Sequence, residues 1–361
     1  ADCQQEYDTP GNRRHHSQTN SCPACGPRLW FAPADGRALT AGTEEALTAA
    51  ARLVFAGGIL ALRGIGGFQL AAVATDTKAV ALLRERKRRE AKPLAVMVRT
   101  LGDAARLGRV GRPEAELLGS PERPVVLLER SPGCPLADGV APGLAWVGVM
   151  LPTTPLHHLL LDRVGRPLVM TSGNLSEEPI ATGNQEALER LAAVADGFLL
   201  HDRDIVSRYD DSVVRSTPLG PVFLRRARGY APLPLDLPVA SPVPFLAVGP
   251  HLKNTFTLVH GRRAFVSQHI GDLENLETLD HFQAALDRFK RLFRIEPEAV
   301  VHDLHPGYFS TRVALDSGLP VLPPVQHHHA HAAAVMAEHG RTEPVLALAF
   351  DGVGYGEDGT V

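Results

Sequence analysis

The residues with the clearest chemical potential are histidines near the end of the chain. Four of the 16 histidines fall within five positions, at His327, His328, His329 and His331. The run over residues 330–340 predicts a helix, because it holds good helix formers, no internal breaker and a terminal glycine. Side chains four residues apart share one face of a helix, so His327 and His331 can direct two imidazoles at one metal ion.

An acidic residue is the expected third ligand of this site. Residues 345–350 are continuously apolar and predict a buried strand, and Asp351 follows at its end, 20 positions after His331. A carboxylate beside two imidazoles would complete a site for a divalent metal. The alternative is a histidine-rich helix start whose imidazoles only cap the helix and form local hydrogen bonds.

Cysteines indicate a second metal site at the beginning of the chain. Three of the four cysteines lie in the first 25 residues, and two residues separate Cys22 from Cys25. Two thiolates at that spacing, followed by glycine, are typical of a zinc knuckle. Cys3, with 18 residues between it and Cys22, would supply a third ligand.

The segment over residues 1–30 carries almost no aliphatic side chains, so a metal ion would have to fold it. Structural zinc takes four ligands. The fourth is either one of His15 and His16 or a cysteine that would stand just before Ala1. The alternative is a disordered leader without metal.

Basic residues form a third group. Residues 77–90 predict a helix and residues 93–98 a strand, and a glycine-rich turn at 63–68 follows a short predicted strand. Six cations fall within nine residues at the junction of that helix and strand, at Arg84, Arg86, Lys87, Arg88, Arg89 and Lys92. Cations beside a glycine-rich turn favour a clamp for polyphosphate, and the alternative is a solvated basic surface.

Polar residues follow a further predicted strand, over residues 167–170, as Thr171, Ser172, Gly173 and Asn174. Ligand contacts in α/β proteins occur at such strand ends, although an ordinary Asx or Ser turn would have the same composition. Residues 207–215 and 223–230 then add acids, a hydroxyl and several arginines. Arginines at this density indicate an anionic partner.

Alternating strands and helices must position these groups, so the chain predicts an α/β fold. Its length of 361 residues predicts two or three domains. Five prolines among 14 residues, over 231–244, predict an extended, stiff linker between them. Further elements are expected as a helix at 43–56 capped by Thr43, strands at 125–129, 147–151, 245–250, 255–259, 264–267 and 300–303, and an amphipathic helix at 276–293.

Composition excludes several classes of protein. Apolar residues make up 44% and charged residues 21%, which is typical of a soluble globular protein. A net charge of −3 gives no general field for nucleic acid or anionic lipid. No apolar run is long enough to span a membrane, and no signal-peptide pattern is present. We therefore expect neither nucleic-acid nor membrane partners, and the few cysteines favour the reducing cytoplasm.

Together the motifs resemble the HypF family, the carbamoyltransferases of nickel–iron hydrogenase maturation. The resemblance is co-linear over nearly the whole chain and rests on the stretches CPACGPR, LRERKRREAKPLAVM, VGVMLPTTPLHHLLL, TSGNLSEEPI, RYDDSVVR, LRRARGYAP, VSQHIGDLENLET, DLHPGYFST, VQHHHAHAAAVMAEHG and FDGVGYGEDG. It implies part of a zinc knuckle over 1–30 and a YrdC-like domain with a twisted mixed sheet over 31–240. It also implies the first part of a TsaD-like domain, of actin-like ATPase fold, over 241–361.

The resemblance also implies a chemistry. Carbamoyl phosphate is cleaved to carbamate, carbamate is joined to AMP from ATP and Mg²⁺, and the carbamoyl group passes to the C-terminal cysteine of a HypE-like acceptor. Lys87, Arg89, Ser172 and Asn174 would contact the nucleotide and catalyse adenylate formation. The same nucleotide pocket would include Lys92, Ser212 and Arg225.

Metal ligands follow from the same resemblance. Structural Zn²⁺ would bind Cys3, Cys22 and Cys25, and a divalent ion, Fe²⁺ or Zn²⁺, would bind His327, His331 and Asp351. The family's order of domains also leads us to expect that the chain begins inside a knuckle and ends inside the last domain, without the acylphosphatase domain that cleaves carbamoyl phosphate.

Four positions depart from the family's usual pattern. Gln69 stands where histidine is usual, Thr153 where tyrosine is usual, Tyr209 where cysteine is frequent and Val353 where threonine is frequent. Two other functions therefore stay open. One is synthesis of threonylcarbamoyl adenylate for tRNA modification, and the other is a truncated paralogue that binds nucleotide without full activity.

Overall fold

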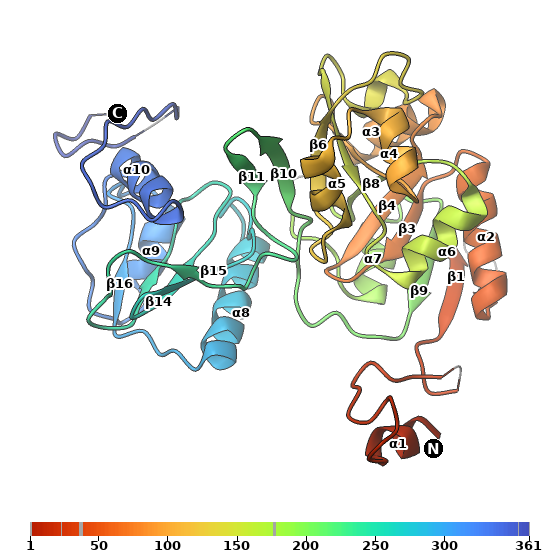
Figure 1. The fold of residues 1–361 in the computed structure, drawn as a ribbon, viewed down its shortest axis with the longest axis horizontal. Coiled ribbons are helices and arrows are strands. Elements are labelled where there is room, and N and C mark those ends of the chain that lie inside the picture. Colours follow the sequence, from red (N-terminus) through yellow and green to blue (C-terminus); the bar gives the residue numbers. More distant parts are fainter. Residues whose placement is uncertain (1, 23, 36–38, 176–177, 353, 361) are drawn as a thin grey trace.

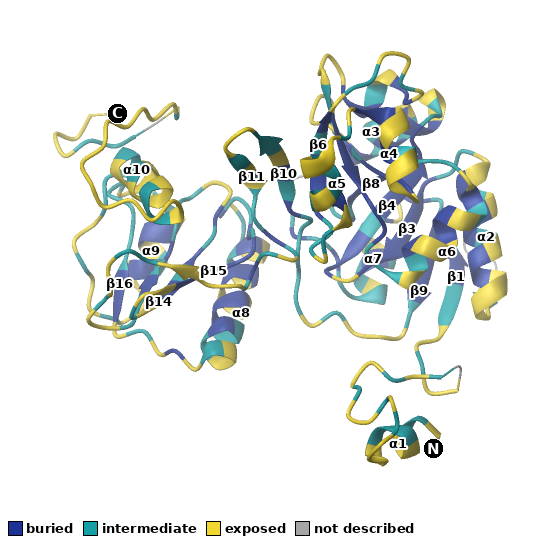
Figure 2. Cartoon of the chain, viewed as in Figure 1, coloured by how far each residue is buried: buried dark blue, intermediate teal, exposed yellow. Residues whose placement is uncertain are grey.

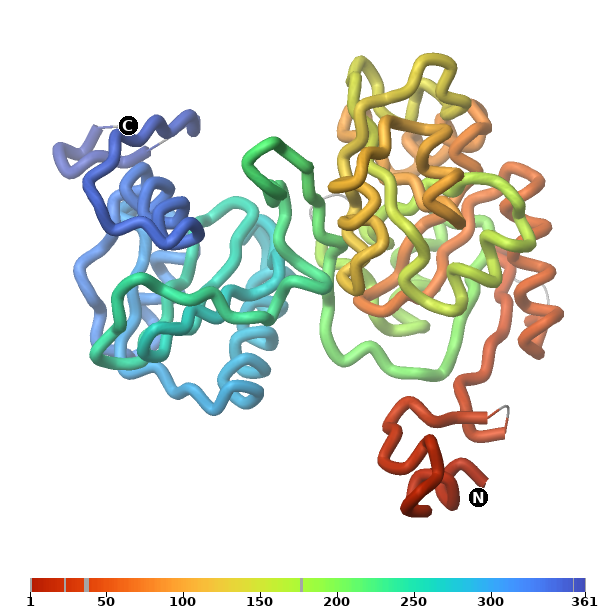
Figure 3. The backbone as a smooth tube through the Cα atoms, in the orientation of Figure 1, coloured from red at the N-terminus to blue at the C-terminus, as the bar shows by residue number. Residues whose placement is uncertain are grey.

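Two β-sheets build the two lobes of the computed structural model, and a hairpin over residues 213–225, at the edge of the first sheet, lies on the side of the second lobe (Figure 1). The structure describes all residues except 1, 23, 36–38, 176–177, 353 and 361. Val353, one of the departures noted above, therefore lies outside the described residues. The tube in Figure 3 follows the chain from the N-terminal segment through the first lobe and the hairpin into the second lobe.

The first lobe holds a mixed sheet of 11 strands in the order β11-β10-β6-β7-β5-β8-β4-β3-β9-β1-β2. Most neighbours are antiparallel, whereas β3 with β9, β5 with β7 and β6 with β10 are parallel. The strands are β1 (Leu29–Pro33), β2 (Thr40–Ala41), β3 (Leu60–Arg63), β4 (Phe68–Val73), β5 (Ala95–Met97), β6 (Val125–Glu129), β7 (Trp146–Met150), β8 (Leu168–Ser172), β9 (Gly197–His201), β10 (Val213–Thr217) and β11 (Gly220–Arg225). The predicted α/β fold is confirmed.

Helices cover both faces of this sheet, because each turns an apolar stripe toward it. On one face α2 (Thr43–Phe55) and α6 (Pro155–Val164) share a core with β3, β4 and β8. The opposite face packs against α3 (Thr77–Lys87), α4 (Leu101–Leu107), α5 (Arg112–Gly119) and α7 (Asn184–Arg190). A short 3-10 turn, Asp138–Val140, packs beside α3.

The second lobe holds a sheet of five strands in the order β12-β15-β14-β13-β16. These strands are β12 (Leu235–Asp236), β13 (Phe245–Ala247), β14 (Thr257–His260), β15 (Arg263–Val266) and β16 (Ala299–Val301). The helix α8 (Leu276–Phe293) has the predicted bounds, and its Phe282, Ala285, Leu286 and Phe289 are buried against the sheet. The helices α9 (Phe309–Leu315) and α10 (His327–Glu338) follow.

The predicted linker is wrong in part, because two of its residues form β12. This strand pairs with β15, with Leu235 opposite Ala264, so it belongs to the second sheet. The predicted cap of α2 is also wrong. Gly42, with φ of 102°, occupies the N-cap position without a side-chain hydrogen bond, and Thr43 is already helical.

The buried strand predicted at 345–350 is a further error. These residues pair with none of the described strands, and Leu346 and Phe350 are each 93% exposed. Figure 2 shows the contrast between the buried centres of both lobes and the exposed surfaces of α10 and the segment after it. An apolar run is buried only where another element covers it, and no described element does so here.

The helix α10 begins at His327, three residues earlier than predicted. Gln326 explains the earlier start, because its Oε1 accepts the N–H of His329 at 2.9 Å and so caps the helix. His327 and His331 are therefore both helical and lie on one face. Among the described helices, none is both long and apolar enough to cross a membrane.

Candidate functional site

A cavity of about 310 Å³ lies against the first sheet, with residues of β4, β5, β6, β7 and β8 in its lining. Its walls come from the glycine-rich turn after β3, the ends of β4 and β8, the segment that follows α3, and β11. The charged lining residues are Arg89, Lys92, Arg225, Arg228, Asp210 and Asp211. Segments that are far apart in the sequence thus meet around one space.

Two glycines allow the cavity walls to approach closely. Gly67 has φ of 153° and lies against the side chain of Ile180, which a Cβ at this position would strike. A Cβ at Gly173 would lie 2.7 Å from the carbonyl oxygen of Phe68, to which the Gly173 N–H donates a hydrogen bond of the same length. Phe68 in turn donates its N–H to Ala181 at 2.8 Å. The glycine-rich turn and the loop after β8 therefore form one unit.

Lys87 is buried against the loop after β8 and donates hydrogen bonds to it. Its side chain is only 4% exposed, and its Nζ donates to the carbonyl oxygens of Ser172 and Asn174 at 2.6 and 2.7 Å and to Asn174 Oδ1 at 2.9 Å. Burial, and then the positive charge of Arg89, lowers the pKa of Lys87 to about 7. Lys87 is absent from the cavity lining, so its predicted contact with nucleotide stays a prediction.

The side chains of Ser172 and Asn174 are fixed by the same network. Ser172 Oγ donates to Asn174 Oδ1 at 2.7 Å, and Asn174 Nδ2 donates to the carbonyl oxygen of Glu178 at 2.6 Å. The amide of Asn174 has one orientation as a result. The structure therefore brings Lys87, Ser172 and Asn174 together as predicted, and Ser172 also lines the cavity.

Three cations crowd one side of the cavity. Burial, and then the charges of Arg84 and Arg225, lowers the pKa of Arg89 to about 10. Partial burial, followed by the positive charges of Arg89 and Arg225, also lowers the pKa of Lys92. Cations that lower one another's pKa repel each other, and a bound polyanion would relieve this repulsion. The arrangement is therefore suited to phosphate groups.

Asp210 connects the cavity to the second lobe. Its Oδ2 lies 2.8 Å from Nδ1 of His269, which follows β15, and its Oδ1 lies 3.7 Å from a guanidinium nitrogen of Arg225. Burial alone would raise the pKa of Asp210, but the hydrogen bond with His269 and the charge of Arg225 lower it to about 2. The carboxylate therefore stays ionised.

A chain of contacts that the sequence did not predict also lines the cavity. Arg228 donates to the carbonyl oxygens of Glu122 and Arg123 at 2.9 and 2.8 Å, and it also holds Asp211 Oδ1 at 3.0 Å. Asp211 Oδ2 then accepts Nε2 of Gln69 at 3.0 Å. Gln69 and Asp211 are 142 positions apart in the chain, so no local motif could reveal the pair.

The three described departures from the family pattern, Gln69, Thr153 and Tyr209, all line this cavity. Thr153 Oγ1 lies 3.0 Å from Nδ1 of His157, which lies in the first turn of α6. Burial, and then the charge of Arg228, lowers the pKa of His157 to about 3, so this imidazole is neutral. The sequence did not single out His157.

Ser212, which the resemblance implied for the nucleotide pocket, is buried, and its contact with nucleotide stays a prediction. Its side chain has no exposure, its Oγ donates to the carbonyl oxygen of Arg228 at 2.8 Å, and it accepts the N–H of Ala227 at 2.8 Å. Both partners are backbone groups of the segment that follows β11. Ser212 therefore fixes the backbone next to Asp211 and does not line the cavity.

A second cavity, of about 580 Å³, adjoins the first at the junction of the lobes. Both cavities are lined by Lys92, Ser172, Asp210 and Arg225, and the second also has Asn174. The second lobe contributes further lining residues, including Lys253, His269 and His281. A small ligand could therefore contact residues of both lobes at once.

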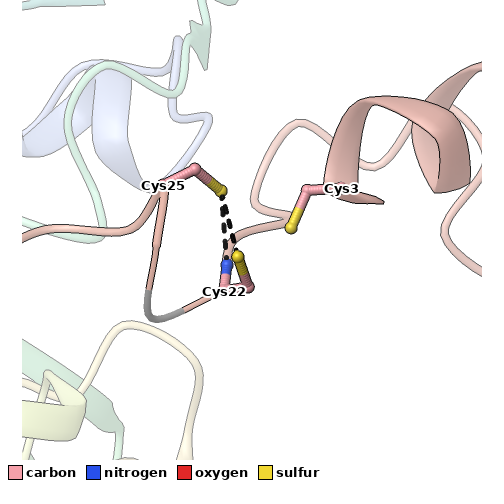
Figure 4. Close-up of side chains that lie close together, drawn as sticks. All are labelled: Cys3, Cys22 and Cys25. Atoms are coloured by element: carbon pink, nitrogen blue, oxygen red, sulfur yellow. Dashed lines mark hydrogen bonds between the residues drawn. The ribbon is translucent and has the colours of Figure 1, made fainter. Parts of the chain in front are cut away.

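The three predicted cysteines meet at the N-terminal segment (Figure 4). Their Sγ atoms lie within 4.8 Å of one another, and Cys22 and Cys25 are 3.6 Å apart. Cys3 comes from α1 (Asp2–Asp8), and its thiol points toward Cys22. Backbone hydrogen bonds from Cys25 and Ala24 lower the pKa of Cys22 to about 7, and the side-chain hydrogen bond with Cys25 raises the pKa of Cys3 to about 12.

Three sulfur atoms at this separation fit the ligand set of structural zinc. His15 and His16 are not part of the group, since the ring of His16 stacks on Tyr7 and lies against the tilted ring of His15 instead. Neither histidine is therefore a fourth ligand in this conformation.

The predicted histidine site also assembles. Ligand atoms of His327, His331 and Asp351 lie within 4.8 Å of one another. Asp351 Oδ2 lies 3.3 Å from Nε2 of His327 and 3.8 Å from Nε2 of His331, and Oδ1 lies 2.7 Å from Nε2 of His328. Both carboxylate oxygens are buried without hydrogen-bond geometry to any described donor. A buried carboxylate that lacks hydrogen-bond donors and lies beside imidazole nitrogens is suited to bind a cation together with them.

Comparisons with known proteins agree with this architecture. Residues 1–32 match the family described as "HypF finger", and residues 240–338 match the "HypF Kae1-like domain". Residues 52–227 match the Sua5, YciO and YrdC family, described as "Telomere recombination".

Individual relatives are similar over most of the chain. The carbamoyltransferase HypF of Synechocystis sp. is 49% identical over 322 residues, which are 89% of this chain and 42% of that protein. A crystal structure of full-length HypF in the phosphate- and nucleotide-bound form has a TM-score of 0.93 at 46% identity, covering 99% of this chain and 46% of the other. The human threonylcarbamoyl-AMP synthase is 33% identical over 189 residues, which are 50% of this chain and 67% of that enzyme.

The chain thus spans less than half the length of the HypF proteins that it matches. Within that span, the finger comes first, the YrdC-type nucleotide-binding domain second and the Kae1-like domain third. Their arrangement superimposes on that of the HypF crystal structure. On these grounds the chain belongs to the HypF carbamoyltransferase family.

Proposed function

We propose that this chain forms carbamoyl adenylate from carbamate and ATP and passes the carbamoyl group to a protein cysteine. The observation that carries the proposal is the crowding of Arg89, Lys92 and Arg225 around the 310 Å³ cavity. The lowered pKa values of Arg89 and Lys92 favour a polyanionic ligand there. A nucleoside triphosphate meets that requirement, and family membership supports the choice.

In the proposed reaction a carbamate oxygen attacks the α-phosphorus of ATP. The bond from the α-phosphorus to the bridging oxygen breaks, and pyrophosphate leaves with that electron pair. Arg89, Lys92 and Arg225 would stabilise the charge that moves onto pyrophosphate. The loop of Ser172 and Asn174, held by Lys87, would orient the small planar carbamate with its hydroxyl and amide. Mg²⁺ would accompany the nucleotide.

The second half of the proposal concerns the second lobe. A thiolate of the acceptor attacks the carbamoyl carbon, and AMP leaves with the electron pair of the broken anhydride bond. The junction cavity supports this relay, since it is lined by both Arg225 of the first lobe and His269 of the second. His327, His331 and Asp351 would hold a divalent ion, Fe²⁺ or Zn²⁺, which would act as a Lewis acid.

We also propose Zn²⁺ on Cys3, Cys22 and Cys25, where it would order the N-terminal segment. The acceptor would be a HypE-like protein with a C-terminal cysteine, and carbamate would derive from carbamoyl phosphate. The thiols suit a reducing compartment, so we propose the cytoplasm.

The test is to identify the product. We would incubate the chain with MgATP and ammonium bicarbonate, which supplies carbamate, and analyse the mixture by mass spectrometry. The expected products are carbamoyl adenylate and pyrophosphate. Arg225→Ala should lower their yield by at least tenfold, whereas Arg112→Ala, a change to a 90% exposed arginine on α5, should not. Absence of both products with the wild-type chain would refute the proposal.

The alternative is threonylcarbamoyl adenylate, favoured by the 33% identity to the human threonylcarbamoyl-AMP synthase. The same assay with threonine and bicarbonate distinguishes the two. Threonylcarbamoyl adenylate as the main product would favour the alternative, and a threonine-independent product would exclude it. ATP binding with neither product would favour a nucleotide-binding module.

A further inference from the structure

The histidine site has a supporting carboxylate that the motifs did not single out. Asp303 follows β16 and is 8% exposed. Its Oδ2 lies 2.6 Å from Nδ1 of His327, and its Oδ1 accepts the N–H of His305 at 2.9 Å. Both oxygens of this side chain are therefore engaged.

The backbone holds Asp303 in place beside the start of α10. Asp303 and Val325 form a parallel bridge, Leu304 donates to the carbonyl oxygen of Val325 at 2.9 Å, and Val325 donates to that of His302 at 3.0 Å. Val325 lies only two residues before His327. These backbone hydrogen bonds thus hold the segment that carries Asp303 beside the start of α10.

This geometry decides the tautomer of His327. An ionised carboxylate only accepts hydrogen bonds, so Nδ1 of His327 must carry the proton that it donates to Asp303. The lone pair of the neutral ring then lies on Nε2, the atom 3.3 Å from Asp351 Oδ2. Nε2 is therefore presented as a ligand atom toward the other members of the site.

The neighbouring histidine is held in the opposite form. Gln326 Oε1 accepts the N–H of His329, so its Nε2 is the amide atom that faces Nδ1 of His328, at 3.3 Å. Since Nδ1 of His328 accepts, the proton lies on its Nε2, 2.7 Å from Asp351 Oδ1. A protonated nitrogen cannot bind a metal, and His328 instead faces the carboxylate with a positive dipole.

We propose that Asp303 is a positioning residue that selects the metal-binding tautomer of His327, while Gln326 excludes His328 from the ligand set. The inference rests on the metal centre proposed above and adds to it the reason why one of two adjacent histidines is a ligand. Carboxylates in this supporting position raise ligand basicity and fix ring orientation, and their loss costs about 10–100-fold in metal affinity.

The test uses Asp303→Asn, which is nearly isosteric. Its amide has a single acceptor oxygen, whereas His305 and His327 both require an acceptor. We would titrate the metal-free chain with Zn²⁺ against a chromophoric chelator and take His327→Ala as the baseline for the cysteine site. Asp316→Asn, an exposed aspartate at the end of α9, is the matched control.

The expected result is one ion more for the wild type than for His327→Ala, and an affinity about 10–100-fold lower for Asp303→Asn but unchanged for Asp316→Asn. Equal affinity of Asp303→Asn and the wild type would overturn the role of Asp303 and leave the metal centre standing. Equal stoichiometry of the wild type and His327→Ala would instead overturn the metal centre, and the inference with it.

A second measurement needs no variant at this site. Nitrogen-15 NMR of the metal-free wild type, labelled at histidine, should show a proton on Nδ1 of His327 and on Nε2 of His328. His327→Ala and His328→Ala spectra assign the two rings. A proton on Nε2 of His327 would overturn the proposal even if Asp303→Asn failed to fold.

Discussion

The contact between Asp210 and His269 should contribute measurably to stability, because it joins the two lobes. The pKa of Asp210 falls from its ordinary value of 3.8 to about 2 in the folded chain. This difference corresponds to about 2 kcal/mol that favours the ionised carboxylate in the native state. The side chain is 21% exposed, so solvent screens the interaction only in part.

Asp210→Asn removes the charge but keeps the size of the side chain. We expect the free energy of unfolding at pH 7 to fall by about 2 kcal/mol, measured by urea denaturation. Both tryptophans, Trp30 and Trp146, lie in the first lobe, so their fluorescence follows that lobe while circular dichroism follows the whole chain. The two probes together show whether the lobes unfold as one unit.

The pH dependence has a defined sign. A depressed carboxyl pKa contributes stability that is fully present above pH 3.8 and is lost as the pH falls toward 2. The difference between Asp210→Asn and the wild type should therefore shrink as the pH falls from 3.8 toward 2. Asp162→Asn, which disrupts an exposed ion pair with Arg99, is the matched control and should unfold like the wild type. Equal stability of Asp210→Asn and Asp162→Asn at pH 7 would refute this reasoning.

Two further predictions concern the proposed ligands. Three acceptors surround Nζ of Lys87, and only the protonated ammonium supplies three N–H donors to them. The affinity for MgATP should therefore fall several-fold as the pH rises from 7 to 9, and calorimetry should show proton uptake on binding. An affinity independent of pH in this range would contradict the role of Lys87. Cys25→Ser should weaken Zn²⁺ binding and make residues 1–32 sensitive to protease. A metal chelator should make the same residues of the wild type sensitive to protease. If the chelator leaves protease resistance unchanged, zinc does not order the segment.

Local patterns in the sequence predicted several helices and strands of both lobes. The spacing of apolar residues in α8 gave its bounds, since that helix buries a regular stripe against the second sheet. Residues 345–350 have an equally apolar pattern but are exposed. An apolar pattern shows that a segment can be buried, but the segment is buried only where another helix or strand covers it.

The candidate site was predictable where a single motif carried it. Ser172 and Asn174 share one loop, and His327 and His331 share one helix face, so their proximity follows from spacing. Ser212 shows the limit of this approach, because its neighbours in the sequence line the cavity while its own hydroxyl turns to the backbone.

Contacts between distant segments could not be predicted. Gln69 meets Asp211, and Asp303 meets His327, only because the tertiary fold brings segments together that are far apart in the sequence. The inward position of Lys87 was also hidden, since a basic run gives no indication of which cation is buried. These contacts depend on tertiary packing and not on local periodicity.

Exchange of labelled pyrophosphate into ATP tests the central claim most directly, because it detects reversible adenylate formation without an acceptor protein. We predict exchange by the wild-type chain that requires carbamate, persists in Arg112→Ala and falls at least tenfold in Arg225→Ala. Failure of the wild type to exchange pyrophosphate in the presence of carbamate, or full exchange by Arg225→Ala, would contradict the claim that the cation-lined cavity activates ATP.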